Sequence, residues 1–192
     1  MPDYQIVRDD DPRCAELEAA GYRVIAESWA VRLSDPDREL LESAVRRVTA
    51  AGLVIRELGR ESAALLHALE TANEADYPDT PATHRAVGSL EKTQALWPEH
   101  RVFGAFDGSR LVGATVIRNH EGMGDTRFTS VLATYRRRGV GQAVKAASIL
   151  AFLDLGITKY ASGGAATNEA SLQANRSLGY ELTERWRTYS PE

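Results

Sequence analysis

The run Tyr135–Ala143, YRRRGVGQA, places three arginines directly before two glycines that are one residue apart. A helix N-terminus has free N–H groups and the positive end of the helix dipole, and glycine lets a backbone approach a ligand closely. Arginine side chains add charge-assisted hydrogen bonds to phosphate oxygens. A helical pattern follows, with one apolar face at Val140, Ala143, Val144, Ala147, Leu150 and Ala151. The run therefore predicts a binding site for a ligand with several phosphates.

Two common nucleotide-binding motifs do not match this run. The phosphate loop Gly-x-x-x-x-Gly-Lys-Ser/Thr is absent. The dinucleotide fingerprint needs a small residue where Val144 stands, and an acidic residue at the end of the next strand, which ITKYAS does not supply. The remaining alternative is a plain helix start with a solvated basic turn.

Composition limits the class of protein. The chain has 192 residues, 43% of them hydrophobic, and a formal net charge of −4. These values suit one globular domain and give no indication of a nucleic-acid partner. The single cysteine, Cys14, excludes an internal disulfide. The acidic start has no apolar run, and the most apolar stretch, AVKAASILAFLDLG, is interrupted by Lys145 and Asp154. We expect a cytoplasmic protein without a membrane partner.

Strand and helix patterns alternate along the rest of the chain. We expect strands or hairpin strands over 22–33, 53–58, 101–119 (turning at Asp107-Gly108), 126–133, 157–162 and 180–190. We expect helices over 35–52 (capped by Asp35), 60–76, 84–96, 140–156 and 168–179. This order indicates an α/β (α+β) domain with antiparallel strands in the middle and one right-handed crossover. We divide the chain into an N-terminal extension, 1–52, and a main domain, 53–192.

Two motifs in the main domain resemble the GNAT superfamily of acetyl-CoA-dependent N-acetyltransferases. Arg136, Gly139 and Gly141 match its Arg/Gln-x-x-Gly-x-Gly/Ala motif, at the usual distance after a strand. Further on, TNEASLQANRSLGY is similar to its Asn-x-x-Ala/Ser run, which closes on Leu-Gly-Phe/Tyr. The resemblance covers about Leu53 to Ser190. It implies a strongly curved, mixed but mostly antiparallel sheet flanked by helices and splayed between its fourth and fifth strands.

The resemblance also implies a cosubstrate, acetyl-CoA, with its pyrophosphate on the glycine turn and its pantetheine arm in the splay. A backbone N–H near Val131 would stabilise the thioester oxygen as it becomes negative. No metal is expected, since the histidines show no metal-ligand spacing. The residues assigned to the cosubstrate are Val131, Arg136, Arg137, Arg138, Gly139, Val140, Gly141, Gln142, Ala143, Asn168 and Asn175. For Asn168 the alternative is a plain helix cap.

The acid and the base of the reaction are less well defined. Many family members have a tyrosine as general acid toward the sulfur, at the position where this chain has Asn175. A thiol pKa of about 8.5 makes thiolate a tolerable leaving group, so a water could serve instead. For the base we select Glu121, in the turn between the third and fourth strands. The alternative for Glu121 is a solvated acidic turn, and His120 is expected at the surface.

The acceptor would bind after the first helix of the main domain. There, ANEADYPDTP contains Asp76 and Asp79, which would attract a cationic amine, and Tyr77, which offers a flat contact. The alternative is a polar loop. The function expected is N-acetyl transfer to a small-molecule or peptide amine by direct attack. Two other functions stay open: an acyl-CoA-binding sensor or structural protein without activity, and a nucleotide-binding α/β module.

The N-terminal extension contains a weak internal repeat. LEAAGYRVIAESWAVRL (Leu17 to Leu33) resembles NRSLGYELTERWRTYS (Asn175 to Ser190), although the spacing from Tyr to Trp differs by one residue. Chance similarity of two amphipathic strands is one interpretation, and the remnant of a once-tandem domain is the other. From the second we expect residues Tyr22 to Leu33 to add a strand to a sheet edge, with Val24 and Ala26 on its buried face. The edge would belong to this chain or to the partner of a homodimer.

Overall fold

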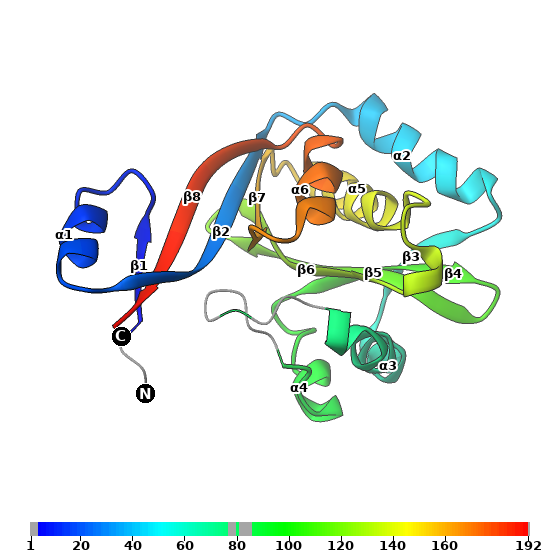
Figure 1. Cartoon of the computed structure of the whole chain (residues 1–192). Coiled ribbons are helices and arrows are strands. Elements are labelled where there is room, and N and C mark those ends of the chain that lie inside the picture. The colour runs from blue at the N-terminus through cyan, green and yellow to red at the C-terminus, as the bar shows by residue number, and fades with distance from the viewer. Residues whose placement is uncertain (1–3, 77–79, 81–85, 192) are drawn as a thin grey trace.

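A computed structural model describes residues 4–76, 80 and 86–191 as one eight-stranded sheet with helices on both faces (Figure 1). The strand order is β1-β8-β2-β7-β6-β5-β4-β3. The strands are β1 (Gln5–Arg8), β2 (Arg23–Ser34), β3 (Val54–Leu58), β4 (Arg101–Asp107), β5 (Arg110–His120), β6 (Met123–Val131), β7 (Lys159–Ala165) and β8 (Glu181–Ser190). β6 and β7 are parallel and all other neighbours are antiparallel. The predicted mixed, mostly antiparallel sheet is confirmed.

The helices divide between the two faces of the sheet. α2 (Arg38–Ala50) and α5 (Val140–Leu153) lie on one face, and α3 (Ala63–Asn73) and α4 (Leu90–Gln94) lie on the other (Figure 1). The remaining helices are α1 (Arg13–Ala19) and α6 (Glu169–Arg176), with short 3-10 turns at Arg60–Ser62, Glu74–Asp76 and Ala133–Tyr135. In the described part of the chain, no helix combines the length and the apolar character that crossing a membrane requires.

Two helix starts differ from the sequence prediction. Asp37, not Asp35, caps α2, because its carboxylate accepts hydrogen bonds from the backbone N–H groups of Glu39 and Leu40. Asp35 adopts a left-handed conformation with φ of 48° instead. The helix expected over 84–96 is limited, in the described residues, to the five residues of α4, while residues 84 and 85 lie outside them.

The N-terminal strand β2 is an interior strand of the sheet. It pairs with β8 on one side and with β7 on the other. The strand predicted over residues 22–33 therefore forms, but it does not lie at an edge of the sheet. The prediction that Val24 and Ala26 lie on the buried face is wrong, because Val24 is 41% exposed, whereas Trp29, Val31 and Leu33 are buried. A register shift between Val24 and Ala26 separates the exposed first part of the strand from the buried second part. The predicted parts 1–52 and 53–192 thus contribute to one sheet.

Trp29 anchors β2 against β7. Its indole N–H donates to the carbonyl of Ala165 at 2.9 Å. The ring lies so close to Gly164 that a Cβ there would come within 2.6 Å of the indole. Gly164 therefore has to be glycine to admit the tryptophan, which belongs to an apolar cluster between the sheet and helices α2 and α5.

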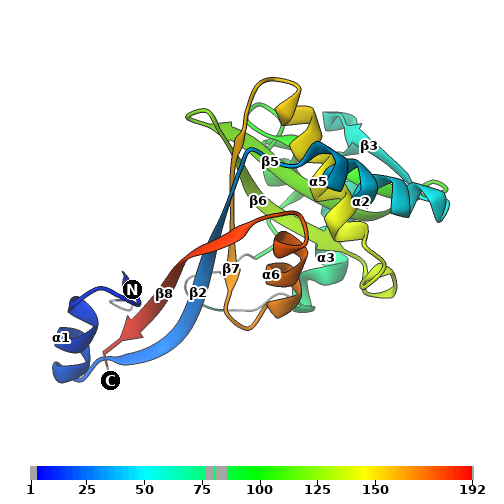
Figure 2. The same cartoon turned by 90° about the horizontal axis from the view of Figure 1, so that it is seen from above.

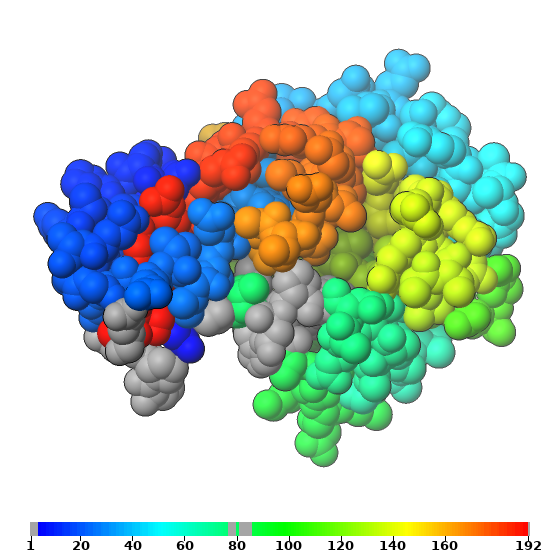
Figure 3. Space-filling view, viewed as in Figure 1, coloured from blue at the N-terminus to red at the C-terminus, as the bar shows by residue number. Residues whose placement is uncertain are grey.

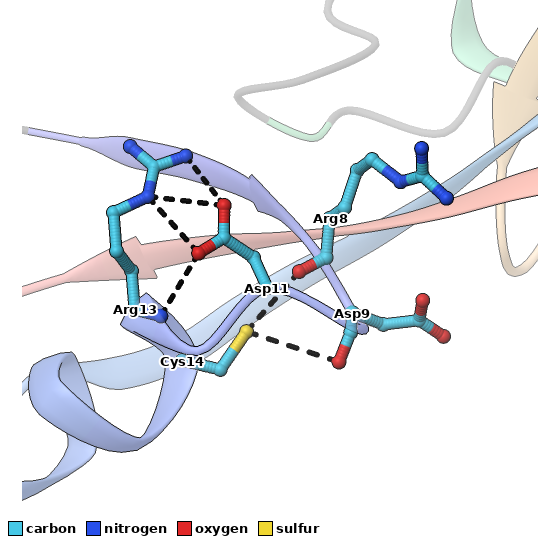
Figure 4. A network of polar contacts seen from close by, with 5 residues as sticks. All are labelled: Arg8, Asp9, Asp11, Arg13 and Cys14. Carbon is cyan, nitrogen blue, oxygen red and sulfur yellow. Dashed lines mark hydrogen bonds and ion pairs between the residues drawn. The ribbon is translucent and has the colours of Figure 1, made fainter.

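Beyond β2 and β8, the chain forms a small end unit of β1 and α1 (Figure 2). Val7, Cys14 and Tyr189 make its apolar contact. Figure 4 shows how α1 begins: the Asp11 carboxylate accepts from the backbone N–H and the guanidinium of Arg13, and the Cys14 thiol donates to the Arg8 carbonyl at 3.2 Å. Cys14 is thus a buried residue of this end unit.

Candidate functional site

The basic turn has two residues in the left-handed conformation. Arg137 has φ of 59° and Gly139, the N-cap of α5, has φ of 79°. Successive backbone N–H groups in a turn can face the same side and make a concave site for an anion. A non-glycine residue in the left-handed conformation is strained, and such strain concentrates at functional sites. The backbone of the turn is therefore shaped for an anionic group.

The two glycines have different reasons to be glycine. At Gly139 the positive φ is what requires a glycine. Space is not the reason, because a Cβ there would meet only ordinary contacts with Val48 and Gln142. At Gly141 the added Cβ would lie 3.5 Å from Val131 and 3.7 Å from Thr129, at the end of β6. Any larger side chain at Gly141 would fill the space between the start of α5 and β6. A ligand that approaches the backbone of Gly141 would therefore lie along the α5–β6 junction.

The gap beside this junction lies between the two parallel strands. β6 and β7 pair only through Met123 to Asp125 and then separate in the described residues. The N–H of Leu132 donates to the Val112 carbonyl of β5 at 3.0 Å. Because N–H groups alternate in direction along a strand, the N–H of Val131 points away from β5, toward the gap. This is the orientation that the predicted role of Val131 requires.

A cavity of about 1060 Å³ joins the turn and the gap. Figure 3 shows this face of the molecule, with the turn (yellow), α6 (orange) and α3 (teal) around the recess. It is lined by Arg47, Asn73, Asp76, Thr129, Ser130, Val131, Tyr135, Arg136, Arg137, Arg138, Gly139, Val140, Gly141, Gln142, Lys145, Asn168, Ala170, Ser171, Gln173, Ala174, Asn175 and Ser177. Five of these residues are basic and one is acidic. The cavity is thus locally positive in a chain of net charge −4, which favours an anionic ligand.

Most residues predicted for the cosubstrate line this cavity, and Ala143 is the exception. Ala143 is fully buried in the core, and its N–H donates to the Gly139 carbonyl within the helix. The lining residues that sequence reasoning missed come mainly from α6, with others from α2, α3, β6, the 3-10 turn at Ala133–Tyr135 and α5. Lys145 is the one with a visible signal in the sequence, because it puts a charge inside an apolar helical run.

Arg136 makes contacts that differ from the prediction. Its guanidinium donates to the Val131 carbonyl at 3.0 Å, to Asn73 Oδ1 at 3.0 Å and to Asp76 Oδ2 at 2.6 Å. Asn73 in turn donates to the Ser130 hydroxyl at 2.8 Å. Arg136 therefore ties the end of β6 to the end of α3, and Asp76, predicted to bind an acceptor, is its partner. Arg137 and Arg138 are exposed beside the turn.

The two asparagines of α6 are occupied by protein groups. Asn168 is the helix cap, since its side chain accepts from the N–H of Ser171 at 3.1 Å. Asn175 is 1% exposed, donates to the Ser171 carbonyl at 2.8 Å and accepts a short hydrogen bond from Lys145. The cap interpretation of Asn168 therefore describes its contact in the structure. Asn175 faces the cavity as part of a buried polar group with Lys145.

Glu121 does not belong to the cavity. It is exposed, with φ of 51°, in the turn before β6. β6 has nine residues and spans roughly 26 Å. Glu121 precedes its first residue, whereas Val131 is its last, so the carboxylate lies at the opposite end of the strand from the cavity. This position does not suit a base for the reaction. Of the predicted acceptor residues, Asp76 lines the cavity, while Tyr77 and Asp79 lie outside the described residues.

Several solved structures share the fold of this chain, although their sequences are distant. A GCN5-related N-acetyltransferase from Sphaerobacter thermophilus has 15% identity and a TM-score of 0.67, with 97% of this chain and 58% of that chain covered. A GCN5-related N-acetyltransferase-like protein from Streptococcus suis has 16% identity and a TM-score of 0.65, with 96% and 70% covered. A tandem GNAT protein from the clavulanic acid biosynthesis pathway has 17% identity and a TM-score of 0.65, with 98% and 63% covered.

The family comparison is more direct. No curated protein matches the chain. The acetyltransferase (GNAT) family matches residues 63–180, which include the basic turn, the splayed strands and α6. Since this match covers more than half of the 192 residues, the chain belongs to the GNAT family of acetyltransferases.

Proposed function

We propose that this protein is an N-acetyltransferase that transfers an acetyl group from acetyl-CoA to a primary amine by direct attack. The observation that supports it best is the single cavity that joins the basic turn, the gap between β6 and β7, and the end of α3. The turn suits a pyrophosphate, the gap suits an extended arm, and the α3 side is left for an acceptor. We expect this reaction to take place in the cytoplasm.

The chemistry makes three demands on the site. The acceptor must be a neutral amine, because a lysine-like ammonium with a pKa of about 10.4 is not a nucleophile. The thioester oxygen becomes negative as the carbon–nitrogen bond forms, and the Val131 N–H is oriented toward it from the gap. The carbon–sulfur bond then breaks and releases the thiolate. The sole cysteine, Cys14, lies in the α1–β1 unit, which argues against a covalent acyl-cysteine and supports direct transfer to the amine.

The acceptor would approach from the α3 side of the sheet. Asp76 lines the cavity there and is bound to Arg136 through a partly exposed ion pair. An exposed pair of this kind contributes at most about 1 kcal/mol, so a cationic amine can compete for the carboxylate. We propose a small molecule or a peptide with a primary amine as the acceptor class. A homodimer stays a prediction, for which light scattering in solution is the measurement.

Binding of the cosubstrate is tested at Gly139. Gly139→Val should distort the turn, and we expect at least a tenfold loss of acetyl-CoA affinity in calorimetry, about 1.4 kcal/mol. The matched control is Gly156→Val, beyond the C-terminal end of the same helix, where φ is 82° and the space around the Cβ is open. Both variants have the same backbone strain, but only the first lies at the cavity. Equal affinities in both variants would remove the turn from the binding site.

A second function, acyl-CoA binding without catalysis, is favoured by one observation. Asn175 stands where many family members have a tyrosine acid, and its amide is bound to Lys145 and Ser171. Turnover of acetyl-CoA over a panel of primary amines separates the two functions. Release of free thiol with at least one amine supports the enzyme. Tight binding of acetyl-CoA with no turnover of any amine supports a sensor. Preferential binding of ATP or NAD would favour a nucleotide-binding module instead.

A further inference from the structure

Lys145 is a buried cation in the wall of the cavity. It lies on α5 one turn after Gly141, on the side of the helix that faces β7 and α6, and only 4% of its surface is exposed. Its ammonium donates to the Ser162 hydroxyl of β7 at 2.9 Å and to the Asn175 amide oxygen of α6. The same nitrogen lies 5.1 Å from the centre of the Tyr180 ring. A lysine is rarely buried to this degree without a carboxylate, so this arrangement calls for a function.

The ammonium has one donor left for a ligand. A lysine has three N–H bonds and no acceptor, and two of them are used by Ser162 and Asn175. Among the described residues no third acceptor is in contact with it. Because Lys145 lines the cavity, the remaining N–H is available to a molecule that enters the gap between β6 and β7.

The face of the sheet on which Lys145 lies determines which of the two substrates its remaining N–H would contact. Lys145 belongs to α5, the helix whose first turn forms the anion site, whereas Asp76 and α3 lie on the opposite face of the sheet. Gly139, Gly141 and Lys145 line the same cavity, so a molecule bound by its phosphates at the turn could extend along α5 to Lys145. The acceptor amine arrives from the α3 side. Lys145 is therefore on the cosubstrate side of the reacting atoms.

We propose that Lys145 is the proton donor to the coenzyme A sulfur, with Ser162 and Asn175 as the positioning residues that hold its ammonium. This inference rests on the proposed function. The amine nitrogen attacks the thioester carbon, the carbon–sulfur bond breaks, and a proton passes from the Lys145 ammonium to the departing sulfur. The products are the amide, the free thiol and a neutral Lys145 amine. The attacking nitrogen loses its extra proton to water, and solvent reprotonates Lys145 before the next cycle.

Two properties of the surroundings agree with this role. Burial lowers the pKa of Lys145 to about 7, so its ammonium is acidic enough to protonate a thiolate whose conjugate acid has a pKa of about 8.5. The Tyr180 hydroxyl is buried beside Thr126, but burial raises the pKa of Tyr180, which makes it the weaker acid. Tyr160 on β7 and Asp125 on β6 act on Tyr180 itself, and both raise its pKa further.

The test measures steady-state kinetics and acetyl-CoA affinity in parallel, over about pH 6 to about pH 9, with an amine that the wild-type protein acetylates. Lys145→Met should lower kcat about 100-fold, with an acetyl-CoA Kd within about threefold of the wild-type value. Lys145→Arg keeps the positive charge but cannot release a proton near neutral pH, so it should be as slow. The wild-type rate should fall at high pH as Lys145 loses its proton, and this limb should be absent from both variants.

Lys159→Met is the matched control, because Lys159 is an exposed lysine on β7, the same strand as Ser162, and it should keep the wild-type rate. Ser162→Ala covers the case in which Lys145→Met does not fold: loss of one acceptor should move the high-pH limb to lower pH. The inference alone would be overturned by a wild-type kcat in Lys145→Met, by rescue in Lys145→Arg, or by an unmoved high-pH limb in Ser162→Ala. A wild-type protein that binds acetyl-CoA but acetylates no amine would overturn the proposed function, and this inference with it.

Discussion

The buried lysine has a cost to folding that depends on pH. The folded-state pKa of Lys145 is lowered to about 7 by burial, whereas an unfolded lysine has a pKa of about 10.4. Between these two values the unfolded chain binds more protons than the folded chain, so raising the pH stabilises the folded state. Below the lower value both states are protonated, and this dependence disappears. The destabilisation caused by burying Lys145 should therefore decrease as the pH rises from about 7 to about 10.

We predict this dependence in denaturant unfolding. Between about pH 7 and about pH 10, the free energy of unfolding of the wild-type protein should rise relative to Lys145→Met by up to about 1.4 kcal/mol per pH unit. Lys145→Met leaves Ser162 and Asn175 without their partner, but that effect is a constant offset that does not change with pH. Lys159→Met serves as the control and should follow the wild-type curve. Parallel curves for all three proteins would show that Lys145 is not buried as described.

Single residues differ in how far the sequence alone predicts their role. Gly139 and Gly141 could be placed at the site because their roles depend on local backbone geometry within one turn. The partners of Lys145 could not, since Ser162 and Asn175 come from β7 and α6 and meet it only in the folded chain. The sequence predicts Glu121 as the base because bases of the family often come from the strands on either side of this turn. Which end of β6 reaches the cavity depends on the whole sheet, and Glu121 lies at the other end.

At the scale of the element, β2 shows what alternation of residue types can and cannot predict. The pattern over residues 22–33 predicts a strand, and a strand forms there. The pattern does not say whether a strand has one neighbour or two, because Ser28 and Ala30 suit an interior position as well as an edge. The register shift near Val24 also changes which residues face the core. Position in the sheet is a tertiary property that local pattern does not contain.

The anchoring of β2 predicts an unequal effect of two tryptophan substitutions. Trp29→Ala should lower the free energy of unfolding by about 3 to 5 kcal/mol, because it removes a buried ring from the core together with the hydrogen bond from the indole to the Ala165 carbonyl. Trp186→Ala on β8 is the control, since Trp186 is only partly buried and its N–H bonds to Glu184 on the same strand. Chemical unfolding gives both values. Equal losses in the two variants would contradict the anchoring role of Trp29.

At the scale of the whole molecule, the fold joins a strand from the start of the chain to the strands at its end. β2 lies between β7 and β8, so in the described residues β7 and β8 do not pair with each other. β8 is therefore connected to the main sheet only through β2. The cavity depends on this connection, because α6, which carries Asn168 and Asn175, lies between β7 and β8 in the chain.

Deletion of residues 1–35 should accordingly disrupt the domain. It removes β2, breaks one sheet into two parts, and leaves unpaired edges on both β7 and β8, which are sites for aggregation. We expect loss of soluble protein, or a large fall in melting temperature with aggregates in size-exclusion chromatography. Deletion of residues 1–21 is the control, since it removes only β1 and α1 at the end of the sheet and keeps β2. This shorter deletion should stay folded and bind acetyl-CoA. A protein without residues 1–35 that keeps the melting temperature and oligomeric state of the full chain would show that β2 is dispensable, against the architecture described.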